Sequence, residues 1–190
     1  IRPGVFAGER TLPIPSVACY VPRGKGSFPS SVLMTAVVAR VAGVPDIGIV
    51  TPPGPDGKID AATLVAAAAA GVDRVYKCGG AQAVAAVAYG TQTVPKMVKI
   101  VGPGSPYVVA AKRLLSDVID PGIPAGPSES IILCDETANG TLAALDLIVE
   151  SEHGPDSSAF LVTNSRAVAD AARKAIPEHW QQMGEQRVSF

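Results

Sequence analysis

Three glycine-containing loops carry the side chains best suited to ligand binding, and each follows a short run of β-branched residues. The first begins at Tyr20 and contains Arg23 and Lys25, the second is Cys78-Gly-Gly-Ala-Gln82, and the third is Gly102-Pro-Gly-Ser105. Glycine lets backbone approach a ligand closely, and a helix start offers unpaired N–H groups. The loops therefore predict a nucleotide site. Tight turns and helix capping are the alternative, because neither the Walker A nor the GxGxxG spacing is present.

A second group of candidate residues lies near the end of a predicted helix at 141–152. Glu150 and His153 are three residues apart there, so their side chains project from one face. A carboxylate and an imidazole are half of a zinc-ligand set. The alternative is a solvated helix end with a favourable dipole contact. The chain has one other histidine, His179.

Strands and helices that alternate along the chain position these loops. Short β-branched runs predict strands at 17–21, 47–51, 72–76, 98–101, 130–134 and 159–163. Apolar residues at helical spacing predict helices at 30–42, 60–70, 80–89, 106–115, 141–152 and 165–176. This order predicts an α/β fold, a Rossmann-like parallel sheet flanked by helices with part of a second Rossmann-like lobe. Ligands of such sheets bind beyond the carboxyl ends of the strands, where the three loops lie.

A cluster of helix and strand breakers at 120–127 predicts a domain boundary. We expect residues 1–16 to lead into the first strand. Residues 17–125 are predicted to form a Rossmann-like nucleotide-binding domain, and residues 126–190 a partial second lobe with the candidate metal ligands.

Composition narrows the possible partners and compartment. The 190 residues are 47% hydrophobic and 17% charged, with a formal net charge of −1, so we expect no nucleic-acid partner. Apolar runs are shorter than the roughly 20 residues that a membrane span needs, so we expect no membrane contact. Cys19, Cys78 and Cys134 form no CxxC pair and predict buried, reduced thiols in the cytoplasm. No signal peptide is visible, and the absence of an initiator Met suggests a piece of a longer protein.

Five phrases of the sequence together resemble the histidinol dehydrogenase family. They stand in that family's order and at about its separations between residues 16 and 163. They are Tyr20-Val-Pro, the GGAQA of 79–83, Val101-Gly-Pro-Gly, Ala125-Gly-Pro-Ser-Glu129 and Glu152-His-Gly-Pro-Asp-Ser157. Family members are about twice this length, so the chain looks like the middle portion of such an enzyme.

The resemblance implies a zinc-dependent homodimer that oxidises L-histidinol to L-histidine by two hydride transfers to NAD, in histidine biosynthesis. By motif position, the implied NAD contacts are Tyr20, Gln82 and Ser105; the implied substrate contacts are Ser128, Glu150 and His153, of which Glu150 and His153 are also zinc ligands. The family's catalytic Glu-His pair follows beyond Phe190, so this chain is expected to hold no catalytic residue and to be inactive alone.

Two residues depart from the family pattern. Glu150 stands where the family usually has Gln, and Ser105 where it usually has Asn. Related family members oxidise other small alcohols, so one alternative is a different alcohol substrate. Another is a nucleotide-binding α/β module without catalysis.

Overall fold

The computed structural model describes residues 2–23, 26–125, 128–153 and 157–183. The chain forms two compact units, Ile1–Ala125 (unit 1) and Gly126–Phe190 (unit 2). Each unit is described by itself below.

Unit 1 is built on a parallel sheet whose strand order is β3-β2-β1-β4. The strands are β1 (Ser16–Tyr20), β2 (Asp46–Thr51), β3 (Val75–Lys77) and β4 (Ile100–Val101). The chain proceeds outward from β1 to β3 and then returns to the other side of β1. Ligands of open α/β sheets bind where the strand order reverses in this way. In unit 1 that point lies between the carboxyl ends of β1 and β4.

One face of this sheet is covered by a helix over residues 29–41 and by α3 (Ala61–Ala69). The first helix consists of α1 (Pro29–Val32), a π-helical turn η1 (Leu33–Val37) and α2 (Val38–Val41). Its buried side chains and those of α3 are small, which lets both helices approach the strands closely. The core on this face includes Val17, Cys19, Val32, Ala36, Ile49, Ala66 and Ala67.

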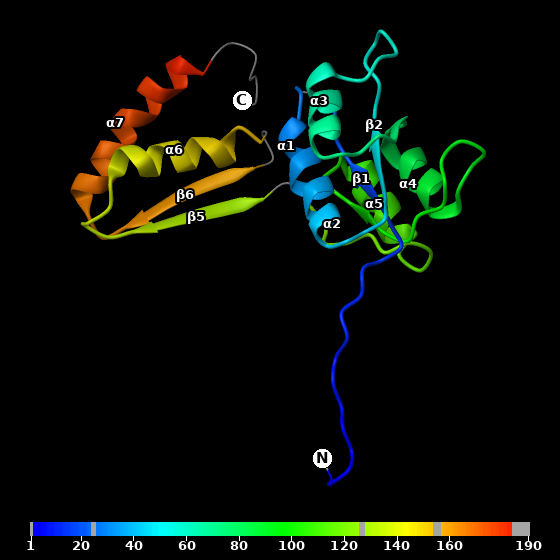
Figure 1. Cartoon of the computed structure of the whole chain (residues 1–190). Helices are drawn as coiled ribbons and strands as arrows, with labels where there is room; N and C mark the ends of the chain where they lie inside the picture. The colour runs from blue at the N-terminus through cyan, green and yellow to red at the C-terminus, as the bar shows by residue number, and fades with distance from the viewer. Residues whose placement is uncertain (1, 24–25, 126–127, 154–156, 184–190) are drawn as a thin grey trace. The chain divides into compact units, whose positions relative to one another are not determined.

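The opposite face is covered by α4 (Gly80–Tyr89) and α5 (Pro106–Leu114), as Figure 1 shows. Its core includes Ala18, Tyr20, Val50, Val84, Val87, Met97, Ile100 and Val108. With helices on both faces, every residue of β1 is buried. This arrangement confirms the predicted α/β class with a parallel sheet flanked by helices.

Unit 2 pairs β5 (Glu129–Cys134) with β6 (Ser158–Thr163) in parallel. Its helices α6 (Gly140–Ser151) and α7 (Arg166–Gln182) both lie on one side of the strands (Figure 1). The helices approach closely at Gly140, where a Cβ atom would lie 2.7 Å from the Val168 carbonyl oxygen. The other face of the strands is apolar and uncovered in the described structure. It carries Ile131, Leu133, Phe160 and Val162.

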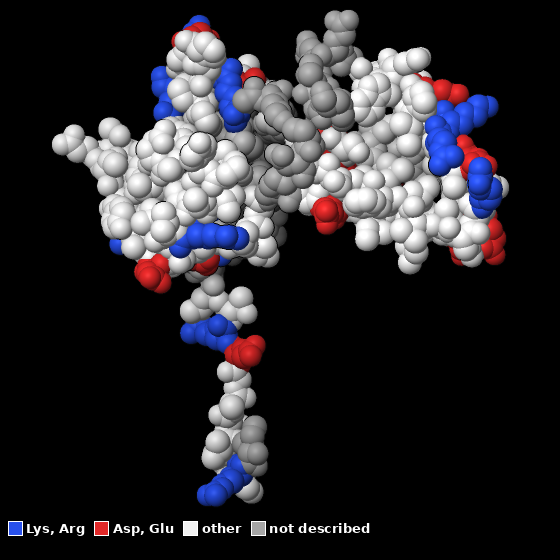
Figure 2. Space-filling view, turned by 180° about the vertical axis from the view of Figure 1, so that it is seen from behind, with Lys and Arg blue, Asp and Glu red and all other residues white. Residues whose placement is uncertain are grey.

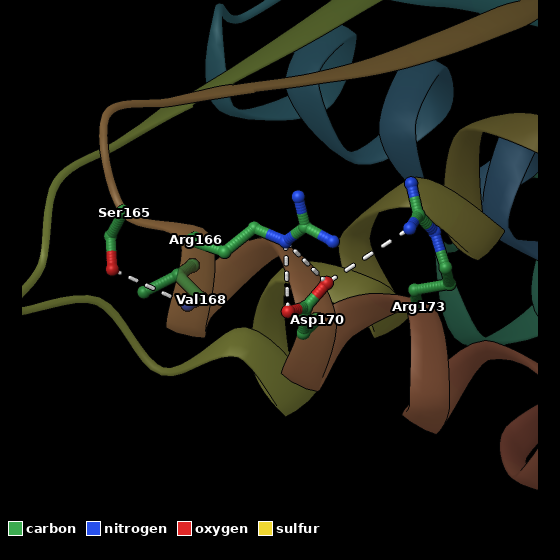
Figure 3. A network of polar contacts seen from close by, with 5 residues as sticks. All are labelled: Ser165, Arg166, Val168, Asp170 and Arg173. Carbon is green, nitrogen blue, oxygen red and sulfur yellow. Dashed lines mark hydrogen bonds and ion pairs between the residues drawn. The ribbon is translucent and has the colours of Figure 1, made fainter.

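Helix α7 is stabilised by polar contacts at its exposed start (Figure 3). The Ser165 hydroxyl accepts a hydrogen bond from the Val168 N–H at 3.4 Å. The Arg166 Nε donates to both carboxylate oxygens of Asp170, at 2.9 and 3.0 Å, and Arg173 lies 3.9 Å from the same carboxylate. Exposed pairs of this kind contribute a few tenths of a kcal/mol each.

The structure corrects the sequence-based expectations for the end of α7 and for the burial of the cysteines. The helix predicted to end at residue 176 continues through Pro177 to Gln182. All three cysteines are free, but Cys19 alone is fully buried, whereas Cys78 and Cys134 are half-buried.

The described surface is weakly charged. On the face shown in Figure 2, blue and red side chains are intermixed and most of the surface is white. Among the described residues, no helix is long and apolar enough to cross a membrane.

Candidate functional site

Tyr20 links the end of β1 to the start of α4. Its side chain is buried, and its hydroxyl oxygen accepts a hydrogen bond from the Gly80 N–H at 2.9 Å. Burial raises the pKa of the Tyr20 hydroxyl, which therefore stays protonated near neutral pH. Tyr20 thus fixes the helix start in place and keeps a proton that it can donate.

Gln82 lies over the same helix start. It is exposed in the first turn of α4, and its side-chain oxygen lies 2.8 Å from where a Cβ of Gly80 would be. Gly80 has a φ of +68°, a conformation that glycine adopts without strain. The Gln82 amide and the Tyr20 hydroxyl therefore converge on Gly80, which brings two of the predicted NAD contacts together.

The loop after β4 approaches β1 from its other side. Gly102 has a φ of +105°, and a Cβ there would lie 2.1 Å from the Tyr20 carbonyl oxygen, so only glycine fits. Ser105 then takes the N-cap position of α5, is exposed, and makes no side-chain capping bond. Its hydroxyl is available to a ligand. The structure thus brings all three predicted NAD contacts to the carboxyl edge of one sheet.

Lys112 is a part of this edge that the sequence analysis missed. It is only 5% exposed, and its ammonium Nζ donates to the Gly102 carbonyl oxygen at 2.7 Å. Burial lowers the pKa of Lys112. One signal was present in the sequence: Val108, Ala111 and Lys112 follow the i, i+3, i+4 spacing of a buried helix stripe. The buried Lys112 therefore holds the loop after β4 in place from inside unit 1.

A small cavity adjoins this loop on the α5 side. It is lined by Gly104, Val108, Lys112 and Pro121 among others, and it contains none of the three predicted NAD contacts. The predicted contacts therefore lie on the open edge of the sheet rather than around this cavity.

Of the cations in the first loop, Arg23 is already engaged by the protein. Its guanidinium donates to the Lys58 carbonyl oxygen at 2.9 Å and lies against Gly54. Arg23 thus ties the loop after β1 to the loop after β2. Lys25 lies outside the described residues.

In unit 2, Ser128 and Glu150 are joined by a hydrogen bond. The Ser128 hydroxyl donates to the Glu150 Oε1 at 2.6 Å, across 22 residues of sequence. The adjoining Ser128 carbonyl accepts the N–H of Ser158, at the start of β6. Two predicted substrate contacts are therefore held together at one end of unit 2. The phrases that contain them include residues 126–127 and 154–156, which lie outside the described residues.

His153 follows the last turn of α6 and is exposed. Its Nδ1 lies 2.9 Å from the Val149 carbonyl oxygen and 3.2 Å from that of Glu150. A carbonyl oxygen only accepts, so Nδ1 is the donor in this contact, and in the neutral ring the Nε2 lone pair would then be free for a metal. The donor types at His153 and Glu150 therefore fit zinc. The described residues contain no group of three or more His, Cys, Asp or Glu side chains placed to hold a metal, so these two donors are a partial ligand set.

Comparison with known proteins gives one consistent result. The sequence model of the histidinol dehydrogenase family matches residues 1–189. A protein of Colwellia psychrerythraea named histidinol dehydrogenase homolog is 68% identical over the whole chain, which covers 43% of that protein. Histidinol dehydrogenase of a Synechocystis species is 57% identical over the whole chain, which covers 44% of it.

The fold of a solved protein matches as well. The crystal structure of histidinol dehydrogenase from Elizabethkingia anophelis has a TM-score of 0.86 and 36% sequence identity; the match covers 94% of this chain and 41% of that one. The chain thus spans less than half the length of the relatives it matches.

Proposed function

Because the chain belongs to the histidinol dehydrogenase family, we propose that the full-length protein oxidises an amino alcohol, histidinol or a close relative, with NAD and zinc. Unit 1 would bind the NAD. Unit 2 would supply two zinc donors and part of the substrate site.

The observation that carries this proposal is the arrangement in unit 2. The Ser128–Glu150 hydrogen bond holds a hydroxyl and a carboxylate at the end of α6, next to His153, whose Nδ1 faces the carbonyl oxygens of the last turn. When bound, zinc supplies a Lewis acid for the alcohol oxygen and NAD accepts the hydride.

The residues of unit 1 act on the cofactor by positioning it. The exposed Gln82 amide and Ser105 hydroxyl would hydrogen-bond ribose or amide groups of NAD. The first turns of α4 and α5 direct backbone N–H groups to the same edge. From inside unit 1, Tyr20 bonds to the start of α4 and Lys112 to the loop that precedes α5.

The residues of unit 2 act on the alcohol and the metal. His153 Nε2 is a neutral donor, and Glu150 adds one negative charge beside the substrate. Ser128 orients that carboxylate by donating to Oε1, which leaves Oε2 for the metal. A negative charge next to the bound alcohol favours a cationic substrate over an anionic one.

A second candidate is a different small amino alcohol. Four relatives at 67–70% identity are named histidinol dehydrogenase homolog, whereas four others named histidinol dehydrogenase are 46–57% identical. Together with Glu150 in place of the usual Gln, this difference favours a substrate related to histidinol but not identical to it.

The test is a substrate screen with the full-length protein, in which NAD reduction is followed with histidinol, other amino alcohols and anionic alcohols. We expect amino alcohols to be oxidised in preference. Gln82→Ala should raise the KM for NAD much more than the KM for the alcohol, whereas Gln92→Ala, at an exposed site away from the helix starts, should change neither. Absence of NAD reduction with every alcohol would leave the non-catalytic nucleotide-binding module as the better interpretation.

A further inference from the structure

Tyr107 is an exposed aromatic residue in the first turn of α5, two positions after Ser105. It is 78% exposed, whereas the next residue, Val108, is fully buried in the core. Side chains of an α-helix tilt toward its N-terminus, so the ring of Tyr107 extends from its own turn toward the start of α5. That start lies at the carboxyl edge of the sheet. Tyr107 therefore presents an aromatic ring at the edge where we propose that NAD binds.

The position of Tyr107 around the helix axis places it on the α4 side of α5. Successive residues of an α-helix are about 100° apart, so Tyr107 and Val109 lie on nearly opposite sides of α5. Val109 and Arg113 line the small cavity next to the segment 121–125. That segment follows Asp120, which pairs with the edge of β4 away from β1. Helix α4 packs against α5 over β1 and β2, so it lies on the other side, with Tyr107.

The surroundings of Tyr107 leave the face of its ring open to a ligand. Its helix neighbours three and four positions away are Ala110 and Ala111, which are too short to cover a ring. No Lys, Arg, Asp or Glu occurs in the segments 78–90 and 102–111, which contain the two helix starts. The first turns of α4 and α5 therefore offer N–H groups to a diphosphate without an acidic side chain of their own that would repel it.

We infer that Tyr107 stacks on a planar ring of the dinucleotide, adenine or nicotinamide, bound across the starts of α4 and α5. This inference rests on the proposed function, because it concerns the same site. Every base has a flat π-face on which an aromatic side chain can stack. The amide of Gln82 and the hydroxyl of Ser105 can only hydrogen-bond, so Tyr107 supplies the apolar contact that a ring needs and these two side chains lack.

The experiment compares Tyr107→Ala with Tyr89→Ala in the full-length protein. Tyr89 is also exposed, at 61%, but it is the last residue of α4 and so lies at the opposite end of the same helix layer. In calorimetric titrations with NAD, Tyr107→Ala should raise the Kd about tenfold or more, the usual loss when a stacked aromatic side chain is removed. Tyr89→Ala should leave the Kd unchanged. Tyr107→Phe keeps the ring and should keep the Kd within twofold.

Titrations with AMP and with nicotinamide mononucleotide identify the stacked ring, because Tyr107→Ala should weaken only the half of NAD that carries it. NAD binding that Tyr107→Ala leaves unchanged, or weakens no more than Tyr89→Ala does, would overturn this inference alone. A loss in Tyr107→Phe equal to that in Tyr107→Ala would overturn it as well, since the hydroxyl would then be the contact. If the unaltered protein bound no NAD, the proposed function and this inference would fail together.

Discussion

Lys112→Met tests whether the buried ammonium holds the loop after β4 in the shape that NAD needs. Methionine keeps the length and much of the packing of the lysine side chain but cannot donate to the Gly102 carbonyl. We expect the fold to remain and the affinity for NAD to fall. The expectation follows from the position of Gly102, which lies against the end of β1 and three residues before Ser105.

The size of the effect follows from the geometry. The bond is short, at 2.7 Å, and Lys112 is 5% exposed, so water has little access to replace the lost donor. A buried carbonyl left without a partner costs about 1–3 kcal/mol. If NAD binding must fix the loosened loop again, most of this cost appears in its dissociation constant. We therefore expect the Kd for NAD to rise about ten- to a hundredfold, which is about 1.4–2.8 kcal/mol.

The same substitution has a pH signature. Burial lowers the folded-state pKa of Lys112 below its ordinary value of 10.5. Between these two pKa values the unfolded chain binds more protons than the folded one, so the free energy of unfolding rises with pH in that window. The charged lysine destabilises the fold below the window and ceases to do so above it. In Lys112→Met this alkaline rise should be absent, as urea unfolding at a series of pH values would show.

Isothermal titration calorimetry of the full-length protein with NAD measures the binding effect. Arg113→Met is the matched control, because Arg113 is the next residue on α5 and is exposed. A Kd for Lys112→Met within twofold of the unaltered protein, or a change equal to that of Arg113→Met, would refute the reasoning. Lys112 would then be a residue of the core without influence on the cofactor.

Three further predictions concern other residues. Gly102→Ala should lower the free energy of unfolding, measured with urea, by several kcal/mol, because the new Cβ atom would clash with the Tyr20 carbonyl oxygen. The control is Gly57→Ala, which has a positive φ as well but open space around it, and which should cost about 1 kcal/mol. Asp60→Ala removes the side-chain cap of α3 and should lower the free energy of unfolding by about 1 kcal/mol at neutral pH. Hydrogen bonds lower the pKa of Asp60, so the stability difference between Asp60→Ala and the unaltered protein should vanish as the pH falls through that lowered pKa. Glu150→Gln in the full-length protein should speed zinc loss to a chelator and leave NAD affinity unchanged; equal zinc retention would show that Glu150 is not a ligand.

Much of the fold could be predicted because each element has a strong local pattern. The helix predicted at 80–89 has the observed bounds of α4, since glycines mark both of its ends. Boundaries failed where tertiary contacts decide. The strand predicted from residue 72 begins at Val75, because the Val72 N–H bonds to the Ala67 carbonyl and closes α3 instead.

Helix α7 shows packing overriding a local signal. Pro177 predicts a helix end, since proline in a helix interior costs about 3 kcal/mol. The helix nevertheless continues to Gln182, and Ile176 and Trp180, one turn apart, are both half-buried on it. Burial of apolar surface on both sides of the proline offsets its cost.

The candidate site could be predicted from the sequence only in part. The glycine loops and the Glu150–His153 spacing are local and could be read directly. The hydrogen bond from Ser128 to Glu150 spans 22 residues, so it depends on the packing of α6 against β5. The role of Lys112 was not predicted, because a lysine on a helix normally faces solvent.

The position of β1 in the sheet has a consequence for how the chain folds as it is synthesised. Although β1 precedes β2, β3 and β4 in the sequence, it lies between β2 and β4, and the Ser16 hydroxyl accepts a hydrogen bond from the Val98 N–H, 82 residues later. A growing chain can pair β1 with β2 and β3 early, but one edge of β1 stays open until Val101 leaves the ribosome. Closing so long a loop is entropically costly and slow. The boundary between β1 and β4, where the cofactor is proposed to bind, is therefore the last part of the sheet to form.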